Sequence, residues 1–430
     1  MFDTCGALGR EQGGPATRER TFAIRGDILS NNGYARAARA MAAILCERFR
    51  VVGVPLHVDP SDCSEPFPGD LVRDGDLGHM AQDAALAVVN HTTPDHFVPF
   101  PDCWNVGAFY WETRGIPRRF DWPERIAAMD AIWAPTGFVA DFTRDCGYDG
   151  PMALVPWPQR FGLPTARRVP AAHLDQHVLL LERMPPAESE TASWPTLPLS
   201  ELLDSPRETF LAIQSLAPRK GLPVMVAEWC RFVAETPEDD SILLIKLAFR
   251  HAHGIGPDPR RHLLEILGRY GVAAGQRLRI GILDAHLDDA ALDALVARAD
   301  CLVSASFGEG FGGPIVEAIA RDVPVIAPRH TGIADLIPAG YPLQVASDER
   351  CVALRDNMEI YPMSATWHLP RPGALAGRLL AFSRMSPEAR RSVAAQARAH
   401  AEAFCGLDAA REAIFAATDA APPSAPRAGR

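Results

Sequence analysis

Short apolar runs alternate with amphipathic stretches along most of the chain, which is the pattern of alternating strands and helices. In the second half the pattern predicts strands at 208–214, 242–248, 278–282, 300–304, 323–327 and 341–345, with helices near 221–236, 258–270, 287–298 and 314–321. In the first half it predicts strands at 21–26, 50–58, 84–90, 105–113 and 151–156, with helices at 34–48 and 122–129. Parallel sheets covered on both faces require this alternation, so the chain is expected to belong to the α/β class.

The same pattern divides the chain, whose 430 residues exceed what one hydrophobic core usually holds. We expect a flexible tail at 1–20, a first Rossmann-like domain at 21–158, a linker or insertion at 159–207, a second Rossmann-like domain at 208–385, closing helices at 386–418 and a disordered tail at 419–430. The linker is expected because prolines, acids and serines recur there with little periodicity, apart from one short strand at 178–181.

Composition narrows the class of protein. Apolar residues make up 47% and charged residues 22%, values typical of a soluble protein. No apolar run approaches the roughly 18 residues that span a bilayer, and residues 1–20 lack a signal-peptide pattern. The nine cysteines are scattered without a C-x-x-C pair. We therefore expect reduced thiols and a cytoplasmic protein without a transmembrane segment.

The charged residues argue against two classes of binding partner and single out two lysines as candidate anion ligands. A net charge of −10 disfavours nucleic acid and anionic lipid as partners. Of the 43 basic residues only Lys220 and Lys246 are lysines, and the remaining 41 are arginines. A compact ammonium group differs from a planar guanidinium, so these two positions are candidates for a specific anion contact; residual codon bias is the alternative.

A glycine-rich loop near residue 310 carries the main candidate chemistry. It follows an apolar run and precedes a helix that is expected to open at Pro314, which would leave the N–H groups of Ile315 and Val316 free for a phosphate. Glu309 and Glu317 flank this point with seven residues between them. One carboxylate is suited to a sugar diol and the other to a ribose, so the loop is typical of a nucleotide-sugar site.

At these residues the chain resembles the family-4 retaining glycosyltransferases of the GT-B fold, whose mark is Glu, seven residues and Glu. The motifs here are EGFGGPIVEA, then VPVIAP, then the turn at Thr331-Gly332. The resemblance implies two Rossmann-like domains facing each other across a donor cleft, with the last helices packing back on the first domain. It implies that Glu309 meets the donor sugar and Glu317 the ribose. The implied donor-binding backbone and side chains also include Phe311, Gly312, Gly313, Ile315 and Thr331.

The resemblance extends to the first strand–helix turn of the second domain. There the family holds the diphosphate with an arginine and, six residues later, a lysine. Lys220 matches the lysine, whereas Gln214 stands at the arginine position. We expect Arg219 and Lys246 to compensate for the missing charge, or activity to be lower.

Candidates in the first domain are less specific. Gly33 is expected where the first strand passes to the first helix, a loop that in the family approaches the donor phosphates; Arg36 there is either a ligand or part of a solvated face. Many family members carry a histidine near the Tyr-Trp-Glu that ends here at Glu112. Glu112 either orients or deprotonates the acceptor, or pairs with Arg114 or Arg118. His91 is expected to make a local hydrogen bond rather than act as a base.

The function implied is transfer of a sugar from a UDP- or GDP-linked donor to a hydroxyl acceptor of unknown class, with retention, in glycan or glycoconjugate synthesis. Such a hexosyltransferase is expected to need no metal and no cofactor. The alternatives are a non-catalytic nucleotide-sugar-binding protein and a GT-B nucleotide-sugar epimerase. Gly308, Gly310 and Gly313 also satisfy G-x-G-x-x-G, so a nicotinamide enzyme and a purely structural turn remain open.

Overall fold

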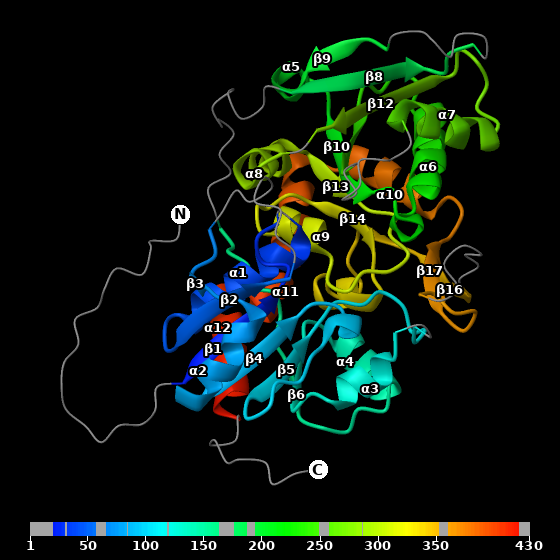
Figure 1. Ribbon diagram of the computed structural model, residues 1–430. Coiled ribbons are helices and arrows are strands. Elements are labelled where there is room, and N and C mark those ends of the chain that lie inside the picture. Colours follow the sequence, from blue (N-terminus) through cyan, green and yellow to red (C-terminus); the bar gives the residue numbers. More distant parts are fainter. Residues whose placement is uncertain are drawn as a thin grey trace.

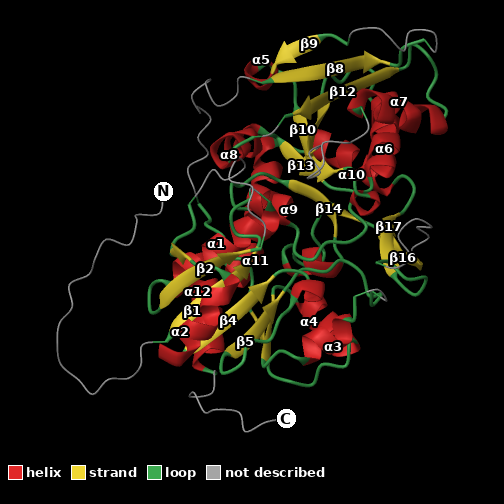
Figure 2. Ribbon diagram, in the orientation of Figure 1, coloured by secondary structure: helices red, strands yellow, loops and turns green. Residues whose placement is uncertain are grey.

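The computed structural model describes residues 20–420, apart from 31, 57–65, 84, 118–119, 163–175, 187–193, 249–257, 286 and 352–359. Two large sheets, the first parallel and the second mostly parallel, lie one above the other, with helices on their faces and between them (Figures 1 and 2). The mixed α/β class predicted from the sequence is confirmed.

The first sheet has seven parallel strands in the order β3-β2-β1-β4-β5-β6-β7. The strands are β1 (Thr21–Gly26), β2 (Arg50–Pro55), β3 (Asp70–Leu71), β4 (Leu86–His91), β5 (Trp104–Ala108), β6 (Ala131–Ala134) and β7 (Met152–Leu154). Its helices are α1 (Gly33–Leu45), α2 (Leu77–Asp83), α3 (Trp122–Ala127) and α4 (Gly137–Asp145). Apolar side chains bury both faces of the central strands, which is why those strands read as unbroken apolar runs.

The second sheet has eight strands in the order β15-β14-β13-β10-β11-β12-β8-β9. The strands are β8 (His177–Arg183), β9 (Thr196–Pro198), β10 (Thr209–Ser215), β11 (Ile242–Ala248), β12 (Arg277–Asp284), β13 (Cys301–Val303), β14 (Val325–Pro328) and β15 (Gln344–Val345). The helices of this half are α5 (Leu199–Asp204), α6 (Leu222–Glu235), α7 (Pro259–Arg269), α8 (Asp289–Arg298), α9 (Gly313–Ile319) and α10 (Ala374–Ser383).

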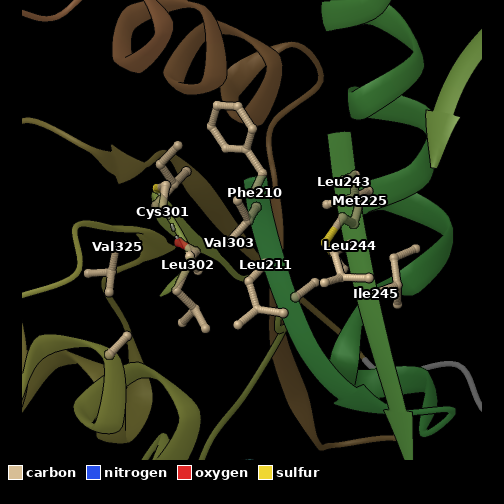
Figure 3. Packing of buried hydrophobic residues seen from close by; sticks show 14 of the residues in the cluster. Phe210, Leu211, Met225, Leu243, Leu244, Ile245, Cys301, Leu302, Val303 and Val325 are labelled. Atoms are coloured by element: carbon tan, nitrogen blue, oxygen red, sulfur yellow. Dashed lines mark hydrogen bonds between the residues drawn. The ribbon is translucent and has the colours of Figure 1, made fainter. Parts of the chain in front are cut away.

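The core of the second half forms around β10, β11 and β13. Figure 3 shows Phe210 and Leu211 between Leu244 on one side and Leu302 on the other. The cluster also includes Ala37 of α1 and Trp157, which follows β7 in the segment leading from the first half to the second, and both residues are buried. The two halves therefore share packed apolar surface.

Two stretches differ from expectation. The short strand expected at 178–181 within the linker is present as the longer β8, and residues 196–198 form β9, which was not expected. Both extend the second sheet, because β8 pairs antiparallel with the edge of β12. The strand expected at 105–113 ends at Ala108. Beyond it the Tyr110 amide donates to the hydroxyl of Tyr34 at 3.0 Å rather than to a neighbouring strand.

A further antiparallel pair, β16 (Ser347–Cys351) with β17 (Thr366–Pro370), was not anticipated. It lies beside both halves at the right of Figure 1. Its backbone reaches each half, since the Thr113 hydroxyl donates to Thr366 O at 2.9 Å and His368 N–H donates to Phe307 O at 2.9 Å.

The closing helices are α11 (Pro387–Cys405) and α12 (Leu407–Asp419). α11 packs on the second half, whose core includes its Val393 and Ala401, so the expected packing on the first half is seen for α12 only. Phe415 of α12 joins the first-half core, and Arg411 pairs with Glu47 at 2.9 Å. Among the described residues, none of the helices has both the length and the apolar character needed to span a bilayer. The tails expected at 1–20 and 419–430 fall mostly outside the described residues.

Candidate active site

The glycine-rich loop between β13 and α9 is pressed against the first half of the molecule. A Cβ at Gly308 would lie 2.1 Å from the carbonyl oxygen of Glu112, and one at Gly310 would lie 2.8 Å from the amide of Trp111. Contacts this short exclude any side chain. These two glycines are therefore required for backbone contact between the halves, which gives the G-x-G pattern a structural cause that the sequence did not show.

Helix α9 begins at Gly313, one residue before the expected start, after Gly312 at a φ of 104°. The amides of Ile315 and Val316 both donate to Gly312 O, at 3.0 and 3.1 Å. The expectation that these two N–H groups are free for a phosphate is therefore wrong in this conformation. Gly312 is the residue that caps the start of α9, and the carbonyl of such a residue accepts the first hydrogen bond of the helix.

Glu309 is the most heavily paired carboxylate of the loop. Its Oε1 lies 2.6 Å from Lys220 Nζ, and its Oε2 lies 3.0 Å from Arg219 Nη1. Burial by itself would raise the pKa of Glu309, but the two cations prevail and lower it to about 2. The Thr331 hydroxyl accepts the Glu309 amide at 3.0 Å, so the backbone of this residue is fixed as well. Glu309 is ionised and rigidly placed.

Arg219 joins the two halves through carboxylates. Besides Glu309 it pairs with Glu112, whose Oε1 lies 3.0 Å from Arg219 Nε. The hydroxyl of Tyr361 donates to the same Glu112 oxygen at 2.7 Å, and its ring stacks on Trp111 with centroids 5.7 Å apart. Of the two arginines expected as partners of Glu112, Arg114 lies 3.5 Å from Asp145 instead, and Arg118 is outside the described residues. One oxygen of Glu112 is thus clamped, while the carboxylate keeps 13% of its side-chain surface exposed.

A small cavity lies at the start of α9, with a volume of about 10 Å³, which is room for about one water molecule. Its lining is Ile213, Gln214, Lys220, Leu302, Val303, Ser304, Glu309, Gly312, Pro314 and Ile315. Gln214 is 7% exposed, and its side-chain Nε2 has no partner among the residues that the structure describes. An unpaired buried donor is costly, so this amide is poised for a ligand or a water molecule.

Glu317 lies outside that cavity and is already engaged. Its Oε1 lies 2.6 Å from Nη1 of Arg36, which extends from α1 of the first half. Arg36 also approaches Asp289 of α8, with Nε 3.3 Å from Oδ1. Burial raises the pKa of Glu317, whereas Arg36 favours its ionised form. Glu317, which was expected to hold a ribose, therefore forms a salt bridge that links the two halves.

Three further candidates from the sequence are Gly33, Thr331 and Phe311. Gly33 begins α1 with open space where a side chain would be, and Thr331 supports Glu309. Phe311 is 3% exposed and packs on Trp157, whose ring also lies over Gly313.

Two further residues depart from their expected roles. Lys246 is buried on β11 opposite Ile213, but it is not part of the cavity lining, and burial lowers its pKa. The ring of His91 packs edge-on against Tyr34 and Tyr110, and its Nδ1 lacks a hydrogen-bond partner within the described part of the chain. Burial lowers the pKa of His91 to about 4, so it is neutral at pH 7.

Sequence reasoning missed Tyr361, Trp157 and Asp289. Tyr361 stands in an irregular stretch without periodicity, and its contact with Glu112 joins residues 249 positions apart. Trp157 and Asp289 were unremarkable in sequence, because a single aromatic or acid beside a strand or helix carries no signal of its own.

Two Rossmann-like halves, with a charged site where the glycine-rich loop meets the first half, define a GT-B architecture. Residues 255–405 match the family model described as "Family 4 Glycosyltransferase in conflict systems". The match covers less than half of the chain and lies in the second half of the molecule, so the likeness to the family-4 glycosyltransferases concerns that part. No curated protein matches its sequence.

Solved structures agree with this fold. A glycosyltransferase from Rickettsia africae is 12% identical with a TM-score of 0.62, covering 94% of this chain and 98% of that one. Sucrose-phosphate synthase from Thermosynechococcus elongatus is 14% identical with a TM-score of 0.58, covering 94% and 98%. HepE from Anabaena, solved with UDP-glucose, is 12% identical with a TM-score of 0.58, covering 93% and 100%. The GT-B fold predicted from the sequence is confirmed.

Proposed function

We propose that this protein is a retaining hexosyltransferase that moves a sugar from a UDP- or GDP-linked donor to a hydroxyl acceptor. The observation that carries the proposal is the convergence of Lys220, Gln214 and Glu309 on the cavity at the start of α9. Once the halves separate enough to admit it, a diphosphate placed there would receive a charged donor from Lys220 and a neutral one from Gln214. Glu309, anchored beside it, would accept hydrogen bonds from the hydroxyls of the donor sugar.

The chemical step follows from these positions. The bond between the anomeric carbon and the diphosphate oxygen breaks, and the acceptor oxygen forms its bond on the same face of the sugar. The acceptor proton passes to the departing phosphate oxygen, so no enzyme carboxylate has to form a covalent intermediate. Lys220 stabilises the charge that develops on the leaving group, a contribution that is large where water is excluded. We expect the step to need no metal and no cofactor.

Glu112 would bind and orient the acceptor. Arg219 and Tyr361 hold one of its oxygens, which leaves the other available to orient an acceptor hydroxyl. Because Arg219 bridges Glu112 and Glu309, it would also fix the distance between acceptor and donor.

The assay is release of UDP or GDP from a panel of nucleotide-sugars, with the product's anomeric configuration read by NMR. A product of retained configuration supports the proposal. An inverted product, or a free sugar epimerised at C2, would reject it. Gln214 and the prior pairing of Lys220 and Arg219 favour one alternative, a non-catalytic nucleotide-sugar binder, which would bind donors yet never release nucleotide.

The tie between Arg36 and Glu317 gives a prediction about donor entry. If Glu317 holds the ribose, the donor must displace Arg36. We expect Arg36→Ala to strengthen UDP or GDP binding about tenfold, since a charge-assisted hydrogen bond no longer competes. The free energy of unfolding should fall by about 2 kcal/mol, because Glu317 loses its partner. Calorimetric titration and urea unfolding measure the two effects, with exposed Arg269→Ala as the control. Weaker binding in Arg36→Ala would show that Arg36 is itself a donor ligand.

A second prediction concerns Tyr361. Tyr361→Phe keeps the stack on Trp111 and removes the hydrogen bond to Glu112. Turnover with acceptor should fall about tenfold, the usual effect of losing one hydrogen bond to a charged group, while nucleotide affinity stays unchanged. Tyr270→Phe, on an exposed tyrosine of α7's C-terminal end, is the matched control. An equal loss of nucleotide affinity would mean that Tyr361 only holds the fold together.

A further inference from the structure

A groove of about 500 Å³ lies beside the site, between the first half and the segment that precedes β17. Its first-half wall carries the charged side chains of Arg114, Asp121 and Glu124 together with isoleucine and proline side chains at 116, 117 and 123. The opposite wall carries Ser364. This volume is that of a small-molecule binding site.

Both walls of the groove are connected to Glu112 by short stretches of chain. Arg114 is two residues from Glu112, a span of at most about 7 Å even in a fully extended chain. Ser364 is three residues from Tyr361, whose hydroxyl contacts Glu112 at 2.7 Å. Packing locks the walls together, because a Cβ at Gly115 would lie 2.3 Å from that of Ala365. The groove is therefore built jointly by two distant segments, and each of these segments also carries one member of the Glu112–Tyr361 pair.

The groove's surface chemistry is that of a carbohydrate site. Among the described residues, the side chains of Asp121 and Glu124 have no hydrogen-bond or ion-pair partner, so each is free to accept two bonds from a vicinal diol. The proline and isoleucine side chains supply an apolar surface for the C–H face of a sugar ring. Among the described lining residues, two carboxylates stand against one guanidinium, a balance that disfavours a phosphate-bearing or otherwise anionic head group.

We infer that this groove binds the acceptor and that the acceptor is a neutral oligosaccharide, with its reactive hydroxyl on Glu112 and its next sugar units between Ser364 and Glu124. The inference rests on the proposed transferase function and adds the class of acceptor to it. It assigns to the segment before β17 a role in acceptor choice, since Ser364 forms one side of the groove.

Two substitutions in the same segment test the groove. Ser364→Trp fills it without removing a hydrogen bond, whereas Met363→Trp places the same ring at a neighbouring side chain that is 73% exposed and outside the lining. The full-length protein, saturated with UDP, is applied to an array of neutral oligosaccharides. We expect wild type and Met363→Trp to bind a common set of glycans, Ser364→Trp to lose at least tenfold in affinity, and Asp121→Asn/Glu124→Gln to do likewise.

UDP affinity separates this inference from the proposed function. All four proteins should bind UDP equally, which also shows that the variants are folded. A wild type that binds UDP but no glycan, or a Ser364→Trp that binds glycans as well as wild type, overturns the groove assignment alone. Binding to vesicles that contain polyprenyl phosphate in place of glycans would overturn it in favour of a lipid-linked acceptor. A protein that binds neither UDP nor GDP would remove the proposed function itself.

Discussion

We expect Glu309→Gln to lower turnover by roughly a hundredfold, or about 3 kcal/mol of transition-state stabilisation. Glutamine keeps the size of the side chain but replaces an ionised acceptor with a neutral group. Lys220 and Arg219 hold the carboxylate of Glu309 at 2.6 and 3.0 Å, so its position toward the donor sugar depends on charge. The measurement is steady-state nucleotide release from the donor that the panel identifies.

The same substitution should change stability in a pH-dependent way. The pKa of Glu309 is lowered from 4.5 to about 2, since Lys220 and Arg219 outweigh burial. A depressed carboxyl pKa contributes stability at pH values above the unfolded-state pKa, and this contribution is lost as the pH falls through the folded-state value. Glu309→Gln should therefore cost about 3 kcal/mol of unfolding free energy at pH 7. The difference from wild type should shrink between about pH 4.5 and pH 2.

Glu228→Gln is the matched control for this experiment. Glu228 is also a buried carboxylate of the second half, but it accepts the amides of Gly373 and Ala376, far from the cavity lining. It should lose stability while turnover stays near the wild-type value. If Glu309→Gln instead loses only stability, Glu309 serves as a structural anchor for Lys220 and Arg219, and the catalytic assignment is wrong.

The local pattern of apolar and polar residues was sufficient to predict the α/β class and most strands of the two large sheets. The strand at 242–248 was predicted with the bounds it has, because a strand covered on both faces must be apolar throughout. The pair β16–β17 was not predicted, because its strands are short and partly exposed and lack such an apolar run. β8 was assigned to a linker because its surroundings lack periodicity, and its pairing with β12 is a contact between distant segments that no local pattern encodes.

The candidate site was predictable to the extent that its residues lie in one motif. Glu309, Lys220 and Gln214 do surround one cavity, as their positions at the ends of neighbouring parallel strands suggest. The pairing of charges was not predictable. Arg219 was considered only as a cation for phosphate, but it bridges Glu309 and Glu112 from different halves. Which carboxylate an arginine pairs with depends on how the two halves pack together. The sequence of a single segment does not contain that information.

That docking also explains why the cavity is small. Backbone contacts at Gly308 and Gly310, the tie from Arg36 to Glu317 and the bond from the Thr136 hydroxyl to Gly310 O at 3.1 Å all hold the halves together over the loop. Space for about one water molecule cannot hold a diphosphate. Donor binding must therefore involve separation of the halves or rearrangement of these pairs, as domain closure does in other transferases.

We expect Lys220→Ala to weaken UDP or GDP binding by about 2 kcal/mol, roughly thirtyfold, and to lower turnover in parallel. Lys220 is the cation that lines the cavity, and the neighbouring Gln214 contributes no charge. Its loss therefore removes ground-state binding of the diphosphate and stabilisation of the leaving group together. Calorimetric titration measures the affinity and nucleotide release measures the turnover. Arg269→Ala removes a cation from the exposed end of α7 and should alter neither quantity.

The pH dependence of binding distinguishes a phosphate ligand from a structural role for Lys220. Burial lowers the pKa of Lys220 from 10.5, although Glu309 opposes this effect. Wild-type affinity for UDP should then decline with rising pH before the ordinary lysine value is reached, since the neutral amine loses its attraction for the diphosphate. Lys220→Ala should lack this alkaline decline, and Lys220→Arg should move it beyond the measurable range because guanidinium stays charged. A decline that persists unchanged in Lys220→Ala would assign the titration to another group and remove Lys220 from the donor site.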